Sequence, residues 1–365
     1  MGIKPRPVII VFLSVILATC AKAPGSQVEY VLGTFCVANL YESGNSQLYS
    51  RIFSRIREID RTMTTFAGEF QELQGSGGNF DSNSRIAEAY QSAVGTLVSG
   101  VVAINRQAGI EPVKVRPDLI EVLEKALYYA ELSGGAFDPT IGPLVKLWGI
   151  GTDTQHIPDD DEISTALALV DWRDLIIDRE EGTAFLRREG MALDLGAIAK
   201  GYAADEALRI AREGRVKRAV FDFGGNIAVL GWREVKGKEL LPWRIGIQNP
   251  LNGRGTYIGV LPVHDTSVVT SGVYERNFEL DEKRYHHLLS TVNGYPVENG
   301  LLSVTIVADS STDADALSTA VFTLGFELGK VLIDSIADTE AIFIFDDNSV
   351  QITDGLIEIF EYNSP

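Results

Sequence analysis

The sequence predicts a mixed α+β domain in which strands and helices are interspersed along the chain. Apolar runs with the character of strands recur from one end to the other, and helical segments with an apolar face lie between them. Hydrophobic residues make up 45% of the 365 residues, enough for a sizeable core, and 35 glycines indicate many tight turns. Since no internal repeat or long linker divides the chain, we expect one domain over residues 28–365.

The first part of this domain is predicted to hold a strand, a helix and a long polar loop. Val28 to Val37 has the composition of a strand. Ser46 to Met63 is expected to be an amphipathic helix, since four residues at helical spacing share one face: Leu48, Ile52, Ile56 and Ile59. Gly68 to Asn83 is rich in Gly, Ser, Asn and Gln, which is typical of a loop, and Ser84 to Ile104 is expected to be helical in part.

The rest of the chain alternates helices with strands. Pro117 is expected to open a helix that runs to Leu132 and ends at a pair of glycines. Ala192 to Leu195 is interpreted as a short strand, with a helix over about residues 197–213 after it. Further strands are predicted from apolar runs or alternation at Arg218 to Phe223, Trp243 to Gln248, Thr256 to Val263, Leu302 to Ala308, Ala341 to Phe345 and Ile357 to Tyr362.

The N-terminus has the features of a targeting segment. Lys4 and Arg6 precede an apolar run from Val8 to Ala18. That run is short for a transmembrane helix and fits the core of a signal peptide over residues 1–19.

Cys20 follows the apolar run directly. Leu17-Ala18-Thr19-Cys20 resembles a bacterial lipobox, although Thr19 replaces the usual Gly or Ala. Acylation of Cys20 would make residues 20–27 a tether and the protein a membrane-anchored lipoprotein facing the periplasm. Ordinary cleavage after Ala21-Lys22-Ala23 is the alternative. In a lipoprotein Cys36 would have no intrachain partner, so we expect it to be a buried thiol.

The charge balance limits the possible ligands. A net charge of −18 argues against nucleic-acid binding, because no basic surplus exists to neutralise phosphates. A small phosphorylated ligand remains possible, but a cation would have to help hold it.

Asp315 and Thr319 provide a candidate for that cation site. They are four residues apart in the segment from Ser311 to Gly325, whose Ala, Leu, Val and Phe content and spacing suit a helix. Residues at i and i+4 share one helix face, and carboxylate and hydroxyl oxygens suit Mg²⁺ or Ca²⁺. The alternative is an ordinary first helical turn in which acids favour the helix dipole and Thr319 only packs.

Three other segments offer binding groups. Asp194 and Lys200 flank a glycine turn before a helix. Free N–H groups at such a helix start can hold anions, Lys200 could reach a phosphate, and the Ala197 carbonyl could face a cation. A plain strand-to-helix turn is the alternative. Ala136-Phe137-Asp138 follows two glycines and is either a ligand contact or a helix end. Of the adjacent His286 and His287, which would point to opposite faces of a strand, at most one is expected to be catalytic.

Together these segments resemble the ApbE family, the FAD:protein FMN transferases. The shared stretches are SGGAFDPTIGPLVKLWG, LDLGAIAKGYAAD, FGGN, TSGVY, HHLL with Asn293-Gly294-Tyr295-Pro296, and ADALSTAVFTLG, in family order and at family-like spacing. The resemblance covers about residues 31–360. It implies the ApbE-type fold, with strands and helices around a flavin cleft.

The resemblance also implies an activity. A family member binds FAD and Mg²⁺, attaches FMN through a phosphoester to a Thr or Ser of an acceptor protein, and releases AMP; hydrolysis of FAD to FMN and AMP is a possible second activity. Family acceptors are flavoprotein subunits of membrane redox complexes. A lipoprotein that binds or scavenges FAD without turnover is the alternative, and it is less favoured because a binder has little need of the cation ligands.

Site residues follow from motif positions. The resemblance places FAD against Leu32, Phe66, Ala136, Phe137, Asp138, Asp194, Lys200 and Leu289. It assigns Mg²⁺ to the Ala197 carbonyl, Asp315, Thr319 and Ser318, and a general-base or aligning role to His287. Three departures stand out: Leu32 replaces a Met, Ser290 replaces an Asp, and residues 68–97 form a probable insertion. We interpret the insertion as a surface loop, with a cover for the flavin or a contact to the acceptor as alternatives.

Overall fold

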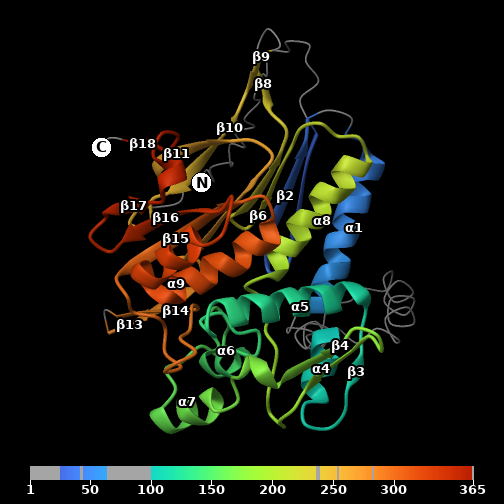
Figure 1. Cartoon of the computed structure of the whole chain (residues 1–365), viewed down its shortest axis with the longest axis vertical. Helices are drawn as coiled ribbons and strands as arrows, with labels where there is room; N and C mark the ends of the chain where they lie inside the picture. Colours follow the sequence, from blue (N-terminus) through green and yellow to red (C-terminus); the bar gives the residue numbers. More distant parts are fainter. Residues whose placement is uncertain are drawn as a thin grey trace, which may run out of the picture.

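A computed structural model describes residues 25–41, 44–63, 100–235, 239–252, 255–281 and 283–363. Its centre is an antiparallel sheet of eight strands (Figure 1). In spatial order the strands are β1 (Gly25–Val31), β2 (Thr34–Leu40), β6 (Ala219–Phe223), β7 (Asn226–Leu230), β12 (Ser267–Gly272), β15 (Leu301–Ala308), β16 (Glu340–Phe345) and β17 (Val350–Ile352). The predicted mixed α+β class is confirmed.

Three helices cover one face of this sheet. They are α1 (Ser46–Met63), α8 (Ala199–Glu213) and α9 (Ser311–Asp334), which pack against one another in that order (Figure 1). The predicted apolar face of α1 is buried in this layer. Among the described helices, α9 is long and apolar enough to cross a membrane, with a mean hydropathy of 1.5, but 56% of that window is buried within the protein. Burial of this kind is expected of a core helix.

The other face of the large sheet packs against a small sheet. Its strands are β10 (Trp243–Gln248), β11 (Tyr257–Val263) and β18 (Glu361–Tyr362). Neighbouring residues of the large sheet divide between the two sides, because side chains alternate along a strand. Val269 and Phe343 lie in the core beneath the helices, whereas Val268 and Ile342 pack against the small sheet.

The remaining elements form the lower half of the molecule in Figure 1 and two small hairpins. The lower half contains α4 (Gly100–Arg106), α5 (Pro117–Leu132), α6 (Gly142–Trp148), α7 (Asp160–Leu167) and a sheet of β3 (Val113–Lys114), β5 (Thr183–Leu186) and β4 (Leu175–Asp178). The hairpins pair β8 (Arg233–Val235) with β9 (Glu239–Leu241), and β13 (Asn277–Leu280) with β14 (Lys283–His286).

Most element predictions are confirmed, but three are wrong. Val28 to Val37 is not one strand, since the chain reverses at Leu32 and Gly33, which have φ angles of 57° and 68°. Positive φ at both central residues is the geometry of a tight hairpin turn, and Leu is an unusual residue for it. Ala192 to Leu195 makes only one isolated bridge, from Ala192 to Ile141. In the segment 357–362, only Glu361–Tyr362 is a strand.

Of the two predictions about cysteine residues, only the one for Cys36 can be compared with the structure. Cys36 is a buried free thiol, as expected, and burial raises its pKa to about 12. Cys20, Phe66 and the predicted insertion at 68–97 lie outside the described residues.

Candidate cation and phosphate site

The start of α9 is fixed by Asp205 of α8. The Asp205 carboxylate accepts hydrogen bonds from the N–H groups of Ser311 (2.8 Å) and Thr312 (2.9 Å). It also accepts from the hydroxyls of Ser310 (2.9 Å) and Thr312 (2.6 Å). Free N–H groups at a helix start need such partners. Asp205 of α8 therefore fixes the position of the first turn of α9, one turn before Asp315.

Asp315 faces the first turn of α8 and is 3% exposed. Its Oδ2 atom accepts from the Gly201 N–H at 2.9 Å. Its Oδ1 atom lies 3.5 Å from Lys200 Nζ, which also donates to the Gly196 carbonyl at 2.9 Å. Asp315 thus keeps one oxygen that is only weakly engaged.

The Ala197 carbonyl is left without its usual partner. In a regular α-helix the Gly201 N–H would donate to the carbonyl four residues earlier, that of Ala197. Here Asp315 takes that N–H. Within the described ranges, no hydrogen bond to the Ala197 oxygen is found. A backbone oxygen therefore remains available at the same turn, and its role as a cation ligand stays a prediction.

Hydroxyl groups from two elements meet beside Asp315. Ser271 Oγ on β12 lies 2.8 Å from Ser318 Oγ and 3.2 Å from Thr319 Oγ1. Ser318 is fully buried and donates to the Asp315 carbonyl at 2.9 Å, whereas Thr319 is partly exposed. Of the two predicted hydroxyl ligands, Thr319 is therefore the more accessible.

The donor set consists of oxygen atoms. Asp315, Thr319 and the Ala197 carbonyl supply a carboxylate, a hydroxyl and a backbone oxygen, which suit a hard cation such as Mg²⁺. Among the described residues, no group of three or more His, Cys, Asp and Glu is placed to hold a metal. The side chains therefore fit a cation that completes its coordination with substrate oxygens and water.

Gly201 allows α8 and α9 to approach closely. A Cβ atom at this position would lie 2.2 Å from the Ser311 carbonyl oxygen and 2.8 Å from Asp315 Cβ. We predict that Gly201→Ala pushes the helices apart and destabilises the fold by about 1–3 kcal/mol, the usual cost of overpacking. Denaturant unfolding measures this loss; an unchanged midpoint would mean that the helices adjust without cost.

The segment around Asp138 lies next to the α8 turn, because the Asp194 N–H donates to the Pro139 carbonyl at 2.9 Å. Asp138 Oδ1 accepts from the N–H and the hydroxyl of Thr140, each at 2.7 Å, and Oδ2 accepts from the Trp172 N–H at 3.0 Å. Burial raises the pKa of Asp138. Its carboxylate holds the turn together, and Phe137 is buried in the core. Direct contact of these residues with FAD stays a prediction, as it does for Ala136.

Asp194 has a similar local role. Its Oδ1 atom accepts from the Gly196 N–H at 2.8 Å and shapes the turn before α8. Leu289 is buried with Leu144 and Trp148, so only a small part of its surface faces outward.

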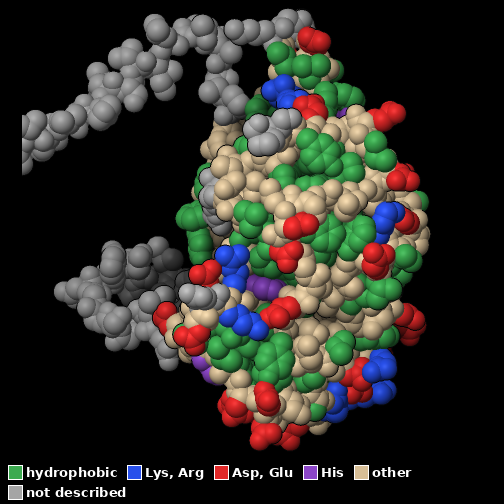
Figure 2. All heavy atoms as spheres, turned by 90° about the vertical axis from the view of Figure 1, so that its left-hand side faces the viewer, with side chains coloured by type: hydrophobic (Ala, Val, Ile, Leu, Met, Phe, Trp, Pro, Cys, Tyr) green, Lys and Arg blue, Asp and Glu red, His purple; other side chains and the backbone are tan. Residues whose placement is uncertain are grey.

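The two histidines point to different environments, as expected. His286 is buried, with Nε2 3.0 Å from the Val297 carbonyl oxygen. His287 is partly exposed, with Nδ1 3.2 Å from the Arg276 carbonyl oxygen. The pKa of His287 is lowered to about 3, mainly by burial and to a smaller extent by the charges of Arg276, His286 and Lys200. The face in Figure 2 shows histidine at the surface beside basic side chains. His287 is therefore neutral at pH 7 and lies within the electrostatic reach of Lys200.

Leu32 joins the same region through Arg276. A Cβ atom on Gly33 would lie 3.0 Å from Arg276 Nη2, so the hairpin turn and this guanidinium are neighbours. The Leu32 N–H donates to the Asp60 carboxylate, which is partly buried and has a raised pKa because of that burial. These contacts hold Leu32 in its strained conformation at the edge of the site.

Sequence reasoning missed three residues that build the site: Ser271, Gly201 and Asp205. All three lie inside stretches that carry the family resemblance, TSGVY and LDLGAIAKGYAAD. Their roles depend on contacts between elements that are distant in sequence, which spacing within one segment does not reveal.

Comparisons with known proteins agree with this arrangement. The model of the ApbE family matches residues 32–343. An FAD:protein FMN transferase of Treponema pallidum is 37% identical over 343 residues, which cover 91% of this chain and 88% of that protein. One of Klebsiella pneumoniae is 40% identical over 246 residues, which cover 67% of this chain and 75% of that protein.

Solved structures show the same fold. The crystal structure of the ApbE protein from Thermotoga maritima aligns with a TM-score of 0.76 at 28% identity, over 92% of this chain and 99% of that one. The flavin transferase ApbE from Vibrio cholerae aligns with a TM-score of 0.72 at 23% identity, over 90% of this chain and 97% of that one.

Proposed function

This chain belongs to the ApbE family, and from that membership we propose that it is an FAD:protein FMN transferase. In the proposed reaction, a Thr or Ser hydroxyl of an acceptor flavoprotein attacks the FMN phosphorus of FAD. The new bond is a phosphoester to FMN, the broken bond is the pyrophosphate P–O bond, and AMP leaves. The observation that carries the proposal is the set of oxygen atoms around Asp315 at the first turn of α8.

These oxygens would hold Mg²⁺, with Asp315, Thr319 and the Ala197 carbonyl as the main ligands and Ser318 behind them. A bound Mg²⁺ would neutralise charge on the diphosphate and on the leaving AMP. The 3% exposure of Asp315 supports the assignment, because a buried carboxylate in a weak contact with one lysine is poised to take a second cation.

Lys200 would act on the substrate phosphates. Its ammonium group lies between Asp315 and the Gly196 carbonyl, on the first turn of α8. A lysine there is a mobile point charge, and the N–H groups of the turn add to the positive field. Lys200 therefore supplies charge where the leaving phosphate develops it.

His287 would accept the proton of the incoming hydroxyl. Its Nδ1 atom faces the Arg276 carbonyl oxygen, so Nδ1 carries the hydrogen and Nε2 keeps the lone pair. A neutral imidazole with a free lone pair can align the incoming hydroxyl, and with a pKa of about 3 it is a weak base that takes the proton only as the new P–O bond forms. When water takes the place of the acceptor hydroxyl, the same step would hydrolyse FAD to FMN and AMP.

The lowered pKa of His287 makes a prediction about pH. An ordinary histidine loses its basic form as the pH falls through about 6.5, whereas His287 keeps its basic form down to about 3. We therefore expect kcat/KM, which reports the free enzyme, to show no acid limb near pH 6.5 from this residue. If kcat/KM of the parent fell as the pH dropped through about 6.5, and this fall were absent in His287→Gln, the low pKa of His287 would be contradicted.

The function is tested by mixing the purified protein with FAD, Mg²⁺ and a candidate acceptor. We expect release of AMP and an acceptor mass increased by one FMN less water. Persistence of intact FAD with and without the acceptor would instead favour the non-catalytic FAD-binding lipoprotein. We further propose that acylated Cys20 anchors the protein to the membrane on its periplasmic side, where flavoprotein subunits of membrane redox complexes would be its acceptors.

A further inference from the structure

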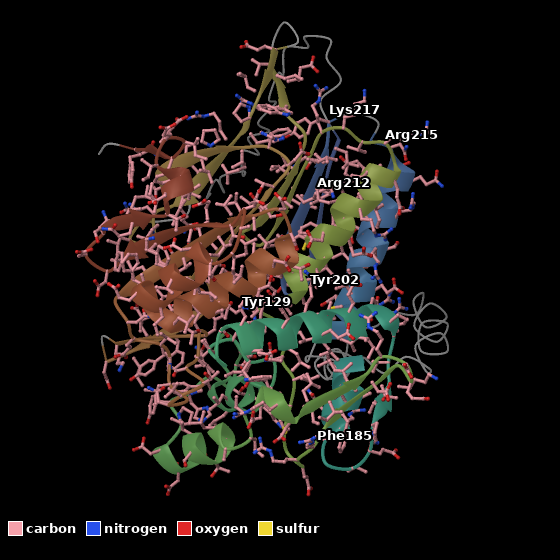
Figure 3. All side chains as sticks on the ribbon, in the orientation of Figure 1. Tyr129, Phe185, Tyr202, Arg212, Arg215 and Lys217 are labelled. Atoms are coloured by element: carbon pink, nitrogen blue, oxygen red, sulfur yellow. The ribbon has the colours of Figure 1, made fainter. Side chains whose placement is uncertain are left out.

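Three basic side chains lie in the last turn of α8 and just beyond it. Arg212, Arg215 and Lys217 are exposed, and we call them the basic end surface. Figure 3 shows them pointing outward at the upper end of α8. In the part of the chain that the structure describes, no ion pair involves any of them. Uncompensated cations are notable in a protein with a net charge of −18.

The basic end surface lies at the end of the molecule where the described chain begins. Gly214, within the surface, packs so closely on Leu48 that a Cβ there would lie 2.7 Å from its side chain. Next to Leu48, the Tyr49 hydroxyl donates to the Gly25 carbonyl and accepts from the Leu40 N–H. Gly25, the first described residue, is therefore beside the end of α8.

The position of Gly25 limits how the domain can sit on a membrane. Gly25 is only five positions after Cys20, and five extended residues span at most about 18 Å. If Cys20 is acylated, the end of the domain that carries Gly25 faces the bilayer. This step depends on the predicted anchor, whereas the basic end surface itself does not.

Charges are distributed unevenly between the two ends of the molecule. Four consecutive acidic residues, Asp159 to Glu162, start α7 at the far end, and Figure 2 shows acidic side chains gathered there. At physiological ionic strength, charges further than about 8 Å from a surface are largely screened. The net negative charge therefore does not prevent the basic end from approaching an anionic bilayer.

Neighbouring groups at the basic end are compatible with a bilayer surface. Glu213 is already paired with Arg51 at 3.0 Å and with Arg209 at 2.6 Å. Glu239 on β9 is exposed and would offset one positive charge. On the β8–β9 hairpin and the turn before it, Leu240 is 54% exposed and Trp232 is 38% exposed, and such side chains suit the interfacial region of a membrane.

We propose that the basic end surface binds the anionic headgroups of the membrane and orients the domain on it. Lys200 and the end of α8 are thirteen residues apart, which corresponds to about 20 Å along the helix. The bound orientation therefore holds the cation site about that far from the bilayer. This inference goes beyond the proposed transferase activity, because binding to lipid needs neither FAD nor a cation.

Vesicle sedimentation tests the proposal. The described contacts lie between Gly25 and Asn363, so a chain from Ala21 to Pro365 keeps all of them and carries no acyl group. We expect this chain to sediment with phosphatidylcholine vesicles that contain phosphatidylglycerol, to remain free with phosphatidylcholine alone, and to dissociate at high salt. The triple variant Arg212→Gln, Arg215→Gln, Lys217→Gln should bind roughly 100-fold more weakly, since each basic residue contributes about a factor of five.

A matched control separates position from net charge. Arg106→Gln, Lys114→Gln and Lys146→Gln together change the net charge by the same amount and replace exposed residues in the lower half of the molecule. This control should bind as tightly as the parent. The proposal is overturned if the parent chain ignores phosphatidylglycerol, if it binds neutral vesicles equally well, or if both triple variants weaken binding to the same extent. Equal denaturant midpoints would show that all three proteins are folded.

Discussion

Replacing Asp315 by Asn is expected to abolish the metal-dependent release of AMP and leave the fold intact. The amide keeps the shape of the side chain and an oxygen that can accept from the Gly201 N–H, but it loses the charge that a divalent cation needs. Removal of one strong electrostatic contact in an active site costs about 10²–10³-fold in rate, and loss of the cation would cost at least that. The measurement is AMP release from FAD as a function of Mg²⁺ concentration.

Asp313→Asn is the matched control for this prediction. Asp313 is two residues earlier on α9, is more exposed, and forms an ion pair with Lys125 of α5. Its loss should leave AMP release close to that of the parent. If Asp315→Asn released AMP at the parental rate, or if both variants lost activity equally, Asp315 would not be the cation ligand.

The sequence predicted relations within one element better than relations between elements. The spacing of Asp315 and Thr319 indicated a shared helix face, and both residues lie on α9. Spacing could not indicate that Ser271, on a strand 48 residues earlier, would lie 3.2 Å from Thr319. Nor could it show that a helix N–H would bond to Asp315 and leave a carbonyl without its partner.

The hairpin at Leu32 shows a second limit. Apolar content favoured one continuous strand, because Leu32 carries none of the usual signals of a turn and only Gly33 does. The turn is specified by contacts made later in folding, among them pairing of β1 with β2 and the hydrogen bond to Asp60. A strained residue maintained by tertiary contacts is difficult to predict from local propensity.

Asp138 shows that a side chain predicted to contact a ligand can also organise the backbone around it. The sequence indicated an acceptor beside a fixed turn, and the structure shows that the carboxylate itself fixes that turn. Polar residues in a ligand-binding motif often organise the backbone, and sequence patterns do not separate the two roles.

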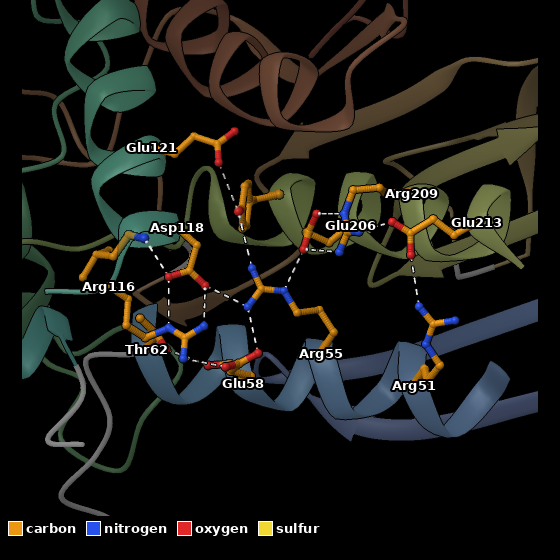
Figure 4. A network of polar contacts seen from close by, with 12 residues as sticks. Arg51, Arg55, Glu58, Thr62, Arg116, Asp118, Glu121, Glu206, Arg209 and Glu213 are labelled. Carbon is orange, nitrogen blue, oxygen red and sulfur yellow. Dashed lines mark hydrogen bonds and ion pairs between the residues drawn. The ribbon is translucent and has the colours of Figure 1, made fainter. Parts of the chain in front are cut away.

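Replacing Arg55 by Ala is expected to destabilise the fold strongly, because Arg55 joins three helices. Arg55 on α1 joins three elements, with Nε 2.7 Å from Glu206 of α8 and Nη1 2.7 Å from Asp118 of α5 (Figure 4). Nη1 is also 2.9 Å from Glu58. Only 14% of the Arg55 side chain is exposed, with 11% for Asp118 and 14% for Glu206. Removal of Arg55 leaves these two shielded carboxylates without their shared partner, which should cost about 3 kcal/mol of unfolding free energy.

Arg51→Ala and acidic pH provide the controls for this prediction. Arg51 is 51% exposed and pairs with Glu213, which is 48% exposed, so its loss should cost less than about 1 kcal/mol.

The contribution of Arg55 should also depend on pH. Burial raises the pKa values of Asp118 and Glu206, but hydrogen bonds from arginines outweigh it, and both pKa values are lowered. Their contribution to stability is therefore complete above the unfolded-state pKa of about 4 and is lost as the pH falls through the lower folded-state values. The difference between the parent and Arg55→Ala, measured by denaturant unfolding, should shrink over that range. Equal effects of the Arg51 and Arg55 substitutions at pH 7 would show that the network adds no more than a surface ion pair.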